Sequence, residues 1–478
     1  MTMPQNHGLL ATSRYVPRLR LERSQIFAQH RWMAPGLKNL AKGQRAMANW
    51  DEDSVTMAIE SIRSLGTAFD DVTSLTLAST SLPFAERNNA GIVASAVQLP
   101  QATVVRDVGS SARAASTELI AALTQRSPGV QLLTAAERRT PKPASTLEMN
   151  QGDGASAVAV GTGPVIATLV GAYSEYADFV DHFRQTGESN DYGWEERWIR
   201  DEGYMKIMVS AIKTCLSRSE VTATQIDHFV MPSMLSKINE AMAKRLGINP
   251  AAVAATHADT VGDLGTAQPL AMLDTVLRQA QPGALILLTT FGSGCDALIL
   301  KRTDVPCPGA EPPAGKAETN YMKYLSFTGQ IDLEWGMRAE MDNKTALTAA
   351  WRDHGRVAHF EGGKCKQCGT VQFPSGRLCV NPSCNAQDSQ HPVSLADAPA
   401  HVLSHTSDFL GYTPNPPFHF GHIDFDEGGR VLMEFTDTDQ EDLHAGLAVR
   451  MVYRIKEHDT KRGFRRYFWK ATPVRASN

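Results

Sequence analysis

Residues 281–300 read QPGALILLTTFGSGCDALIL, and this stretch decides the fold. A Pro-Gly turn precedes one apolar run, and a Gly-Ser-Gly loop leads into a second. Apolar runs of this length between turn signals are typical of fully buried strands. Glycine in the loop allows a positive φ and a close approach of backbones. The segment therefore predicts two buried strands joined by a tight loop.

The same order of elements occurs earlier in the chain. Residues 127–136 read SPGVQLLTAA, and residues 152–160 read GDGASAVAV. In each half a glycine-rich loop also opens an Ala/Leu-rich helix, at 114–125 and at 269–280. Strands that alternate with such helices indicate a layered α/β architecture. The duplication predicts two stacked sheets with paired helices between them.

Composition changes sharply after Lys301, where RTDVPCPGAEPPAGKAE has the proline and glycine content of a linker. We therefore expect a catalytic α/β domain over 1–305 and a linker over 306–320. A helical lead-in with a cysteine cluster is expected over 321–392, and a small all-β domain over 393–478.

Four of the seven cysteines lie within one short segment, CKQCGTVQFPSGRLCVNPSC at 365–384. Two cysteine pairs at this spacing are typical of a zinc ribbon, and four thiolates leave no open coordination position. We therefore expect a structural Zn²⁺ site, not a catalytic one. Its predicted ligands are Cys365, Cys368, Cys379 and Cys384.

Short alternating segments follow, among them AHVLSHT, GRVLMEFTDT and RRYFWKATPV. They indicate a small β-barrel, for which an OB-fold is the usual companion of such a ribbon. Residues 461–470 mix basic and aromatic residues as single-strand binders do. We favour a solvated basic strand, with contacts to the phosphates of a small-molecule ligand or to the α/β domain as the alternatives. At a net charge of −4 no nucleic-acid partner is expected.

The chain has no apolar run of about 18 residues, so no membrane-spanning helix is expected. Its N-terminal residues have no apolar signal core. We therefore expect a cytoplasmic location and no membrane partner.

Five segments in order give the first 303 residues a specific resemblance. They are GLLATSRYVPRLRLER (8–23), DEDSVTMAIESIR (51–63), GDGASAV (152–158), YADFVDHFR (176–184) and FGSGCDALIL (291–300). The chain resembles the thiolase superfamily, and within it 3-hydroxy-3-methylglutaryl-CoA synthases and β-ketoacyl synthase III enzymes. Residues 320–478 resemble the zinc-ribbon/OB domains that accompany such enzymes. The resemblance implies an α/β fold of five layers in an αβαβα arrangement, acyl-CoA chemistry and a homodimer.

The catalytic positions that this resemblance implies are all changed. The nucleophilic cysteine corresponds to Ala112, the histidine to Val230 and the asparagine to Asp263. The general-acid/base glutamate of the 3-hydroxy-3-methylglutaryl-CoA synthases corresponds to Thr80. Acyl-cysteine catalysis at the usual place is therefore impossible.

We nevertheless expect chemistry to be retained, because the elbow stays polar. The N–H groups at its helix N-terminus suit an enolate or oxyanion. Asp263 is a candidate general base if burial raises its pKa, and Arg113 a candidate clamp for a substrate carboxylate. Further catalytic candidates are Ser110, Ser111, Cys295, His257 and Glu86, and the CoA-binding candidates are Gly292 and Gly294. Packing roles remain open for Cys295 and His257, and a surface role for Glu86.

Residues 173–200 add aromatic side chains that each have two possible roles. Tyr173, Tyr176 and His182 are candidates for an acyl pocket or for core packing. Trp194, Trp198 and Arg200 belong to WEERWIRDEGY, predicted as an amphipathic helix at the pocket mouth or at a dimer interface.

Three functions fit these observations. The leading hypothesis is CoA- or acetyl-CoA-dependent cleavage of a β-keto acid or β-keto acyl-CoA, by retro-Claisen or acyl-transfer chemistry. The second is a Claisen condensation of the 3-hydroxy-3-methylglutaryl-CoA synthase type. The third is a non-catalytic acyl-CoA-binding scaffold for a partner thiolase.

Overall fold

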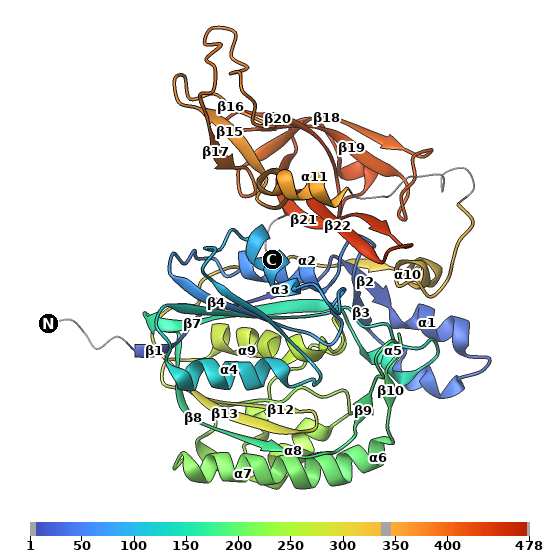
Figure 1. Ribbon diagram of the computed structural model, residues 1–478. Helices are drawn as coiled ribbons and strands as arrows, with labels where there is room; N and C mark the ends of the chain where they lie inside the picture. Colours follow the sequence, from blue (N-terminus) through green and yellow to red (C-terminus); the bar gives the residue numbers. More distant parts are fainter. Residues whose placement is uncertain (1–5, 336–345, 476–478) are drawn as a thin grey trace, which may run out of the picture.

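The computed structural model describes residues 6–335 and 346–475. Two stacked halves of one sheet lie among three layers of helices, and a β-rich domain covers one end (Figure 1). The stacked sheets predicted from the repeat and the five-layered arrangement implied by the resemblance are therefore confirmed.

Nine strands form one mixed sheet in the order β11-β12-β13-β8-β1-β7-β6-β4-β5. The two halves have the same topology, because β6 and β7 are antiparallel as β12 and β13 are, and β4 and β11 lie parallel to their neighbours. Only the pair Leu9–Ala167 joins β1 to β8. The strands are β1 Asn6–Tyr15, β4 Val72–Ala78, β5 Val104–Val108, β6 Val130–Glu137, β7 Gly154–Gly163, β8 Ala167–Tyr176, β11 His228–Val230, β12 Leu285–Phe291 and β13 Gly294–Arg302.

Two helices fill the space between the halves, α4 (Ala114–Gln125) and α9 (Gln268–Gln279). Their leucines and alanines form one buried cluster with strand residues of both halves, which is why both helices are apolar on most sides. The outer layers are α2 (Ser54–Arg63) and α3 (Asn89–Ala96) on one side, and α7 (Val209–Arg218) and α8 (Ile238–Leu246) on the other (Figure 1).

A small sheet flanks this body. Strand β14 (Lys316–Glu318), inside the predicted linker, runs parallel to β2 (Leu19–Glu22), which pairs with β3 (Gln44–Met47). Helix α10 (Tyr321–Phe327) buries its aromatic side chains against α1 (Arg23–His30) and its neighbours. The shorter helices are α5 Thr146–Asn150 and the 3-10 turns Pro35–Leu40, Ala223–Gln225, Pro250–Ala252, Gly265–Ala267 and Gln440–Asp442.

The C-terminal region consists of a three-stranded cysteine-bearing sheet and a five-stranded antiparallel sheet of order β20-β19-β18-β21-β22. Helices α11 (Leu347–Arg352) and α12 (His354–Ala358) precede them. The strands are β15 Glu361–Cys365, β16 Val371–Gln372, β17 Gln390–Ser394, β18 Ala400–Asp408, β19 Phe418–Phe425, β20 Arg430–Glu434, β21 Ala448–Asp459 and β22 Phe464–Pro473.

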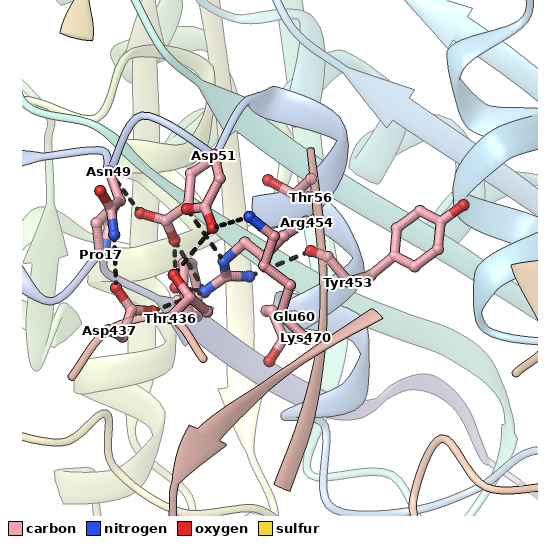
Figure 2. Close-up of polar contacts among 12 residues, drawn as sticks. Pro17, Asn49, Asp51, Thr56, Glu60, Thr436, Asp437, Tyr453, Arg454 and Lys470 are labelled. Atoms are coloured by element: carbon pink, nitrogen blue, oxygen red, sulfur yellow. Dashed lines mark hydrogen bonds and ion pairs between the residues drawn. The ribbon is translucent and has the colours of Figure 1, made fainter. Parts of the chain in front are cut away.

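Buried charges join the two regions where the start of α2 meets β21 and β22 (Figure 2). Lys470 Nζ lies 3.0 Å from Asp51 Oδ2 and 3.0 Å from Glu434 Oε2. Burial alone would lower the pKa of Lys470, but these two carboxylates outweigh it and raise that pKa. Arg454 lies 3.2 Å from Glu52 and 3.0 Å from Asp437. Because these groups are almost fully buried, each depends on its partner for stability.

Apolar packing continues across the same boundary. Residues of α2 and β4 share one buried cluster with Phe360, Met451 and Trp469 of the C-terminal region. The two regions therefore bury a common core. No helix in the described part of the chain combines the length and apolar character needed to cross a bilayer.

We predict that Lys470→Met lowers the free energy of unfolding by about 3–5 kcal/mol, because it removes the closest cation from the buried carboxylate of Asp51. Urea unfolding followed by tryptophan fluorescence measures the loss. Lys461→Met, at an exposed turn, is the matched control. Equal stability of the two variants would contradict a structural role for the Asp51–Lys470 pair.

Candidate active site

The elbow before α4 meets the loop between β12 and β13. Ser110 has a left-handed φ of 68°, which turns the chain sharply after β5. Ser111 Oγ donates to the carbonyl of Gly292 over 2.9 Å. A Cβ added at Gly292 would lie 2.9 Å from Ser111 Oγ and 3.5 Å from Ala112 Cβ, so this glycine permits the close approach of the two loops. The position of the missing cysteine is thus enclosed by both halves of the fold.

Arg113 holds the second loop in place. Its Nη1 lies 2.7 Å from Asp296 Oδ1, and its Nε donates to the Gly292 carbonyl over 2.9 Å. Asp296 is fully buried and also accepts from Ser116 and Thr117. These contacts engage the guanidinium with protein groups, so Arg113 serves in this structure to position the Gly-Ser-Gly loop.

A buried carboxylate lies beside Thr80, where the resembled synthases place their glutamate. Glu137, at the end of β6, accepts from Thr80 Oγ1 at 3.0 and 3.1 Å and from Ser81 Oγ at 2.6 Å. Thr266 Oγ1 donates to it over 2.8 Å. Glu137 was not among the residues predicted from the sequence. The feature that could have identified it is the charged run Glu-Arg-Arg at the end of a buried strand.

Asp263 pairs with Arg139, which was also not among the site residues predicted from the sequence. Arg139 Nη2 lies 2.9 Å from Asp263 Oδ1, and the N–H of Gly265 donates to the same oxygen over 2.9 Å. Burial alone would lower the pKa of Arg139, but Asp263, Glu137 and Asp191 outweigh it, so the pKa is raised. The Asp263 side chain is 15% exposed, which leaves it within reach of a ligand.

A two-stranded flap, β9 (His182–Phe183) and β10 (Tyr192–Gly193), ties these loops together. Arg184 contacts the Thr80 carbonyl and lies 3.2 Å from Asp191. Gln151 donates to Asp191 over 3.1 Å. The flap therefore joins the loop after β4 to the segment before β7.

Aromatic side chains from the segments on both sides of the flap pack against Phe291 and one another. Phe179 stacks on Trp198 at 6.3 Å between ring centroids and meets Phe291 edge-on at 5.8 Å. Phe291 packs on Tyr204, whose pKa burial raises. Tyr204 belongs to a π-helix, Ile199–Met208, that continues α6 (Glu196–Trp198), and π-helical segments are frequent at functional sites. The predicted helix at WEERWIRDEGY is present.

The remaining predicted residues lie in different surroundings. Cys295 is fully buried, and burial raises the pKa of its thiol well above the ordinary value, which keeps it protonated. Glu86 is exposed on a loop. His257 has a left-handed φ of 58° and lies 3.3 Å from Thr275 Oγ1. Gly294 packs against the Glu175 carbonyl.

The residues predicted for the acyl pocket do not lie together in the structure. The Tyr173 ring faces Arg218 at 4.8 Å, whereas Tyr176 is 89% exposed. Trp194 and Trp198 are about half exposed, and Arg200 pairs with its neighbour Asp201 at the surface.

The four clustered cysteines come together as the spacing predicted. Their sulfur atoms all lie within 4.8 Å of one another. Cys365 lies 3.9 Å from Cys384, and Cys368 lies 3.5 Å from Cys379, sulfur to sulfur. Four converging thiols at these separations could bind a metal ion.

Two family models match the chain. Residues 216–301 match the C-terminal part of 3-oxoacyl-[acyl-carrier-protein] synthase III, and residues 399–454 match the C-terminal OB-fold domain of ChsH2. The hydroxymethylglutaryl-CoA synthase of Aeropyrum pernix is 26% identical over 72% of this chain and 97% of its own length. That of Caldivirga maquilingensis is 25% identical over 69% of this chain and 99% of its own length.

Solved structures agree on the fold. The FabH synthase III of Pseudomonas aeruginosa superposes with a TM-score of 0.54 at 19% identity, over 63% of this chain and 98% of its own. OleA of Xanthomonas campestris gives a TM-score of 0.56 at 19% identity, over 62% and 97%.

These findings define the class of the protein: a thiolase-like α/β domain followed by an OB-fold domain with a cysteine cluster. More narrowly, the α/β domain is similar to hydroxymethylglutaryl-CoA synthases and has the fold of FabH and OleA. The resemblance stated from the sequence is confirmed.

We predict that Asp181→Asn lowers the pKa of His182 toward its ordinary value. The hydrogen bond that His182 Nδ1 donates to the Asp181 carboxylate, at 3.1 Å, raises that pKa in the folded chain. The resulting stabilisation is fully present below the unfolded pKa of about 6.5 and is lost as pH rises through the raised folded value. NMR titration of the histidine side chains measures the shift. Asp178→Asn is the matched control, and an unchanged His182 titration in Asp181→Asn would contradict the assignment.

Proposed function

We propose that this protein cleaves a β-keto acid or β-keto acyl-CoA by direct acyl transfer to CoA, without an acyl-enzyme. The observation that carries the proposal is alanine at position 112, enclosed by an otherwise polar elbow and followed by α4. A fold similar to that of CoA-dependent synthases supports acyl-CoA as the substrate class. Without a cysteine at this point, the acyl group has to pass directly between two bound molecules.

In the proposed reaction the sulfur of CoA attacks the keto carbonyl and the carbon–carbon bond breaks. Asp263 takes the thiol proton, and Arg139 orients the carboxylate. The bond electrons form an enolate, which accepts a proton and leaves as the shorter acid or thioester. The first N–H groups of α4 have no acceptor within the helix and face developing negative charge.

Glu137 organises this centre. It is fully buried and accepts from hydroxyl groups of three different residues, so its lone pairs are engaged by the protein. Thr80 and Thr266, which it holds, come from the two halves of the fold. We therefore assign Glu137 to positioning and Asp263, which is partly exposed, to proton transfer.

The reverse reaction is a Claisen condensation through the same groups. The similarity to hydroxymethylglutaryl-CoA synthases favours this second candidate function. A scaffold for a partner thiolase is the third, favoured by the replacement of the four expected catalytic residues. We also propose a homodimer, because β5 is an edge strand of the large sheet and its Val104 is 60% exposed.

We predict that Asp263→Asn lowers kcat by about 10²–10⁴-fold, because the proton acceptor is lost. Purified protein is incubated with CoA or acetyl-CoA and a panel of aliphatic and aryl β-keto acids, and new acyl-CoA is detected by mass spectrometry. Asp259→Asn, exposed in the same loop, is the control and keeps its activity. A stable mass increase of the protein on exposure to acetyl-CoA would contradict transfer without an acyl-enzyme. No product across the panel, with CoA still bound, would favour the scaffold.

We further propose that the cysteine cluster holds a structural Zn²⁺. Four thiolates suit a closed tetrahedral zinc site, in which no position is left for substrate. Cys365 is the last residue of β15, and the other three cysteines lie in the loops beside it. Val371 of β16 and Leu395, just after β17, belong to the core shared with α2. Zinc would therefore stabilise the ribbon and its attachment and take no part in the reaction.

We predict about one zinc per chain, released from wild type by a thiol reagent and absent from Cys379→Ser. Elemental analysis measures the metal, and thermal unfolding of the variant shows a lower midpoint. Cys307→Ser, in the linker outside the cluster, is the matched control. Equal zinc content in Cys379→Ser and wild type would contradict the assignment.

A further inference from the structure

A cleft of about 330 Å³ opens where the thiolase-like domain, the linker and the OB-fold domain meet. Its walls come from the β1–β2 turn, the end of α2, residues 309–314 of the linker and the last strands of the chain. Its size is at the lower end of small-molecule sites. The five arginines that line it are Arg14, Arg18, Arg63, Arg450 and Arg475.

Two of these arginines are fully engaged by the protein. Arg14 contacts Asp274, Thr275 and, in the linker, Glu311. Arg63 uses its nitrogens on Glu60, Asp397 and two backbone carbonyls. Both therefore hold the walls together.

The other three have donors to spare. Arg18 reaches Asp439 at 2.6 Å and Asp442 at 3.7 Å through Nη2 alone. Arg450 binds Glu60 at 2.7 Å through Nη1 alone. Arg475 gives one Nη2 contact, to the backbone carbonyl of Asp437. Within residues 6–335 and 346–475, no partner is recorded for the remaining guanidinium nitrogens of these three side chains.

Like charges are also held close together here. Burial and the positive charge of Arg18 both lower the pKa of Arg475. Asp437, Asp439 and Asp442 offset this effect in part, but no carboxylate of the described residues lies within ion-pair distance of Arg475, whose one hydrogen bond goes to a backbone carbonyl. A half-buried guanidinium whose bonded partner is neutral favours an anionic ligand.

We propose that this cleft binds a ligand that carries a diphosphate group. Each guanidinium can grip two oxygens of a phosphate side by side, and three guanidinium groups from separate segments exceed what one carboxylate needs. The diphosphate could belong to CoA, in which case the inference rests on the proposed function, or to a separate nucleoside diphosphate. Binding would clamp the linker and the C-terminal residues onto the thiolase-like domain.

A second cleft links this site to the catalytic loop. It measures about 270 Å³, shares Arg14, Val16 and linker residues 312–314 with the first, and is lined by Val261 and Leu264 on either side of Asp263. His257 belongs to this second cleft, and burial and Arg14 lower its pKa. A ligand in the first cleft would therefore fix the linker segment that also borders the Asp263 loop.

Isothermal titration of the full chain with inorganic pyrophosphate tests the proposal. We expect measurable binding by wild type and an affinity about tenfold weaker in Arg475→Gln and in Arg450→Gln, because each loses a charge-assisted contact. Arg430→Gln, on an exposed pair with Asp424, is the matched control and binds as wild type does. Equal affinity in all four proteins, or sulfate binding as tightly as pyrophosphate at the same ionic strength, would overturn it.

Titration with CoA and with ADP then identifies the source of the diphosphate. A tenfold loss of CoA affinity in Arg475→Gln supports CoA as the ligand. Unchanged CoA affinity with weakened ADP binding supports a separate nucleotide. If Arg475→Gln binds both CoA and ADP as tightly as wild type does, the proposal is overturned. The Asp263 assay is unaffected by that outcome, so failure of this proposal can be distinguished from failure of the proposed function.

Discussion

The buried charges at the start of α2 are the constraint on which the two-domain structure depends. Asp53 caps α2 by accepting from the N–H groups of Val55 and Thr56, and it also accepts from Tyr467 of the OB-fold domain at 2.7 Å. One carboxylate thus starts the helix and fixes the strand above it. Since removal of any partner leaves an uncompensated charge in the interior, the domains hold one arrangement.

The large sheet connects this interdomain contact to the candidate active site. Helix α2 packs on β6 and β7, and Ser61 of α2 lies 2.9 Å from Thr134 of β6, hydroxyl to hydroxyl. Three residues further along β6 is Glu137, which holds Thr80 and Thr266. The position of the proposed catalytic groups is therefore set by packing between layers, and a rigid scaffold of this kind is what proton transfer at fixed distance needs.

The replaced residues make sense together in this setting. The elbow, the N-terminus of α4 and the glycine-rich loop are present, and alanine occupies the position to which the resemblance assigns a nucleophilic cysteine. Arg113 braces the loop against Asp296, and charge gathers instead around Asp263, Arg139 and Glu137. Proton transfer is thus supported where covalent catalysis is not, which is the basis of the proposed direct transfer.

Local sequence determined the elements and the metal-binding cluster. The repeated Pro-Gly turns and Gly-x-Gly loops mark the starts of β6, β7, β12 and β13. The short apolar runs that follow them indicate buried strands, because such strands can bury both faces only inside a layered fold. The cysteine spacing brought four sulfur atoms together, because both pairs lie on tight local turns. The replacement of the expected catalytic residues was also visible from the sequence alone.

Tertiary structure alone decided which charges meet. Glu137 lies 57 positions from Thr80 and 129 from Thr266, and Arg139 lies 124 from Asp263, separations over which no pattern in the sequence operates. The engagement of Arg113 by Asp296 and the deep burial of Cys295 likewise depend on how the two halves stack. Local backbone preference and hydrophobic spacing act over a few residues, whereas the pairing of buried charges is fixed only when distant segments exclude water together.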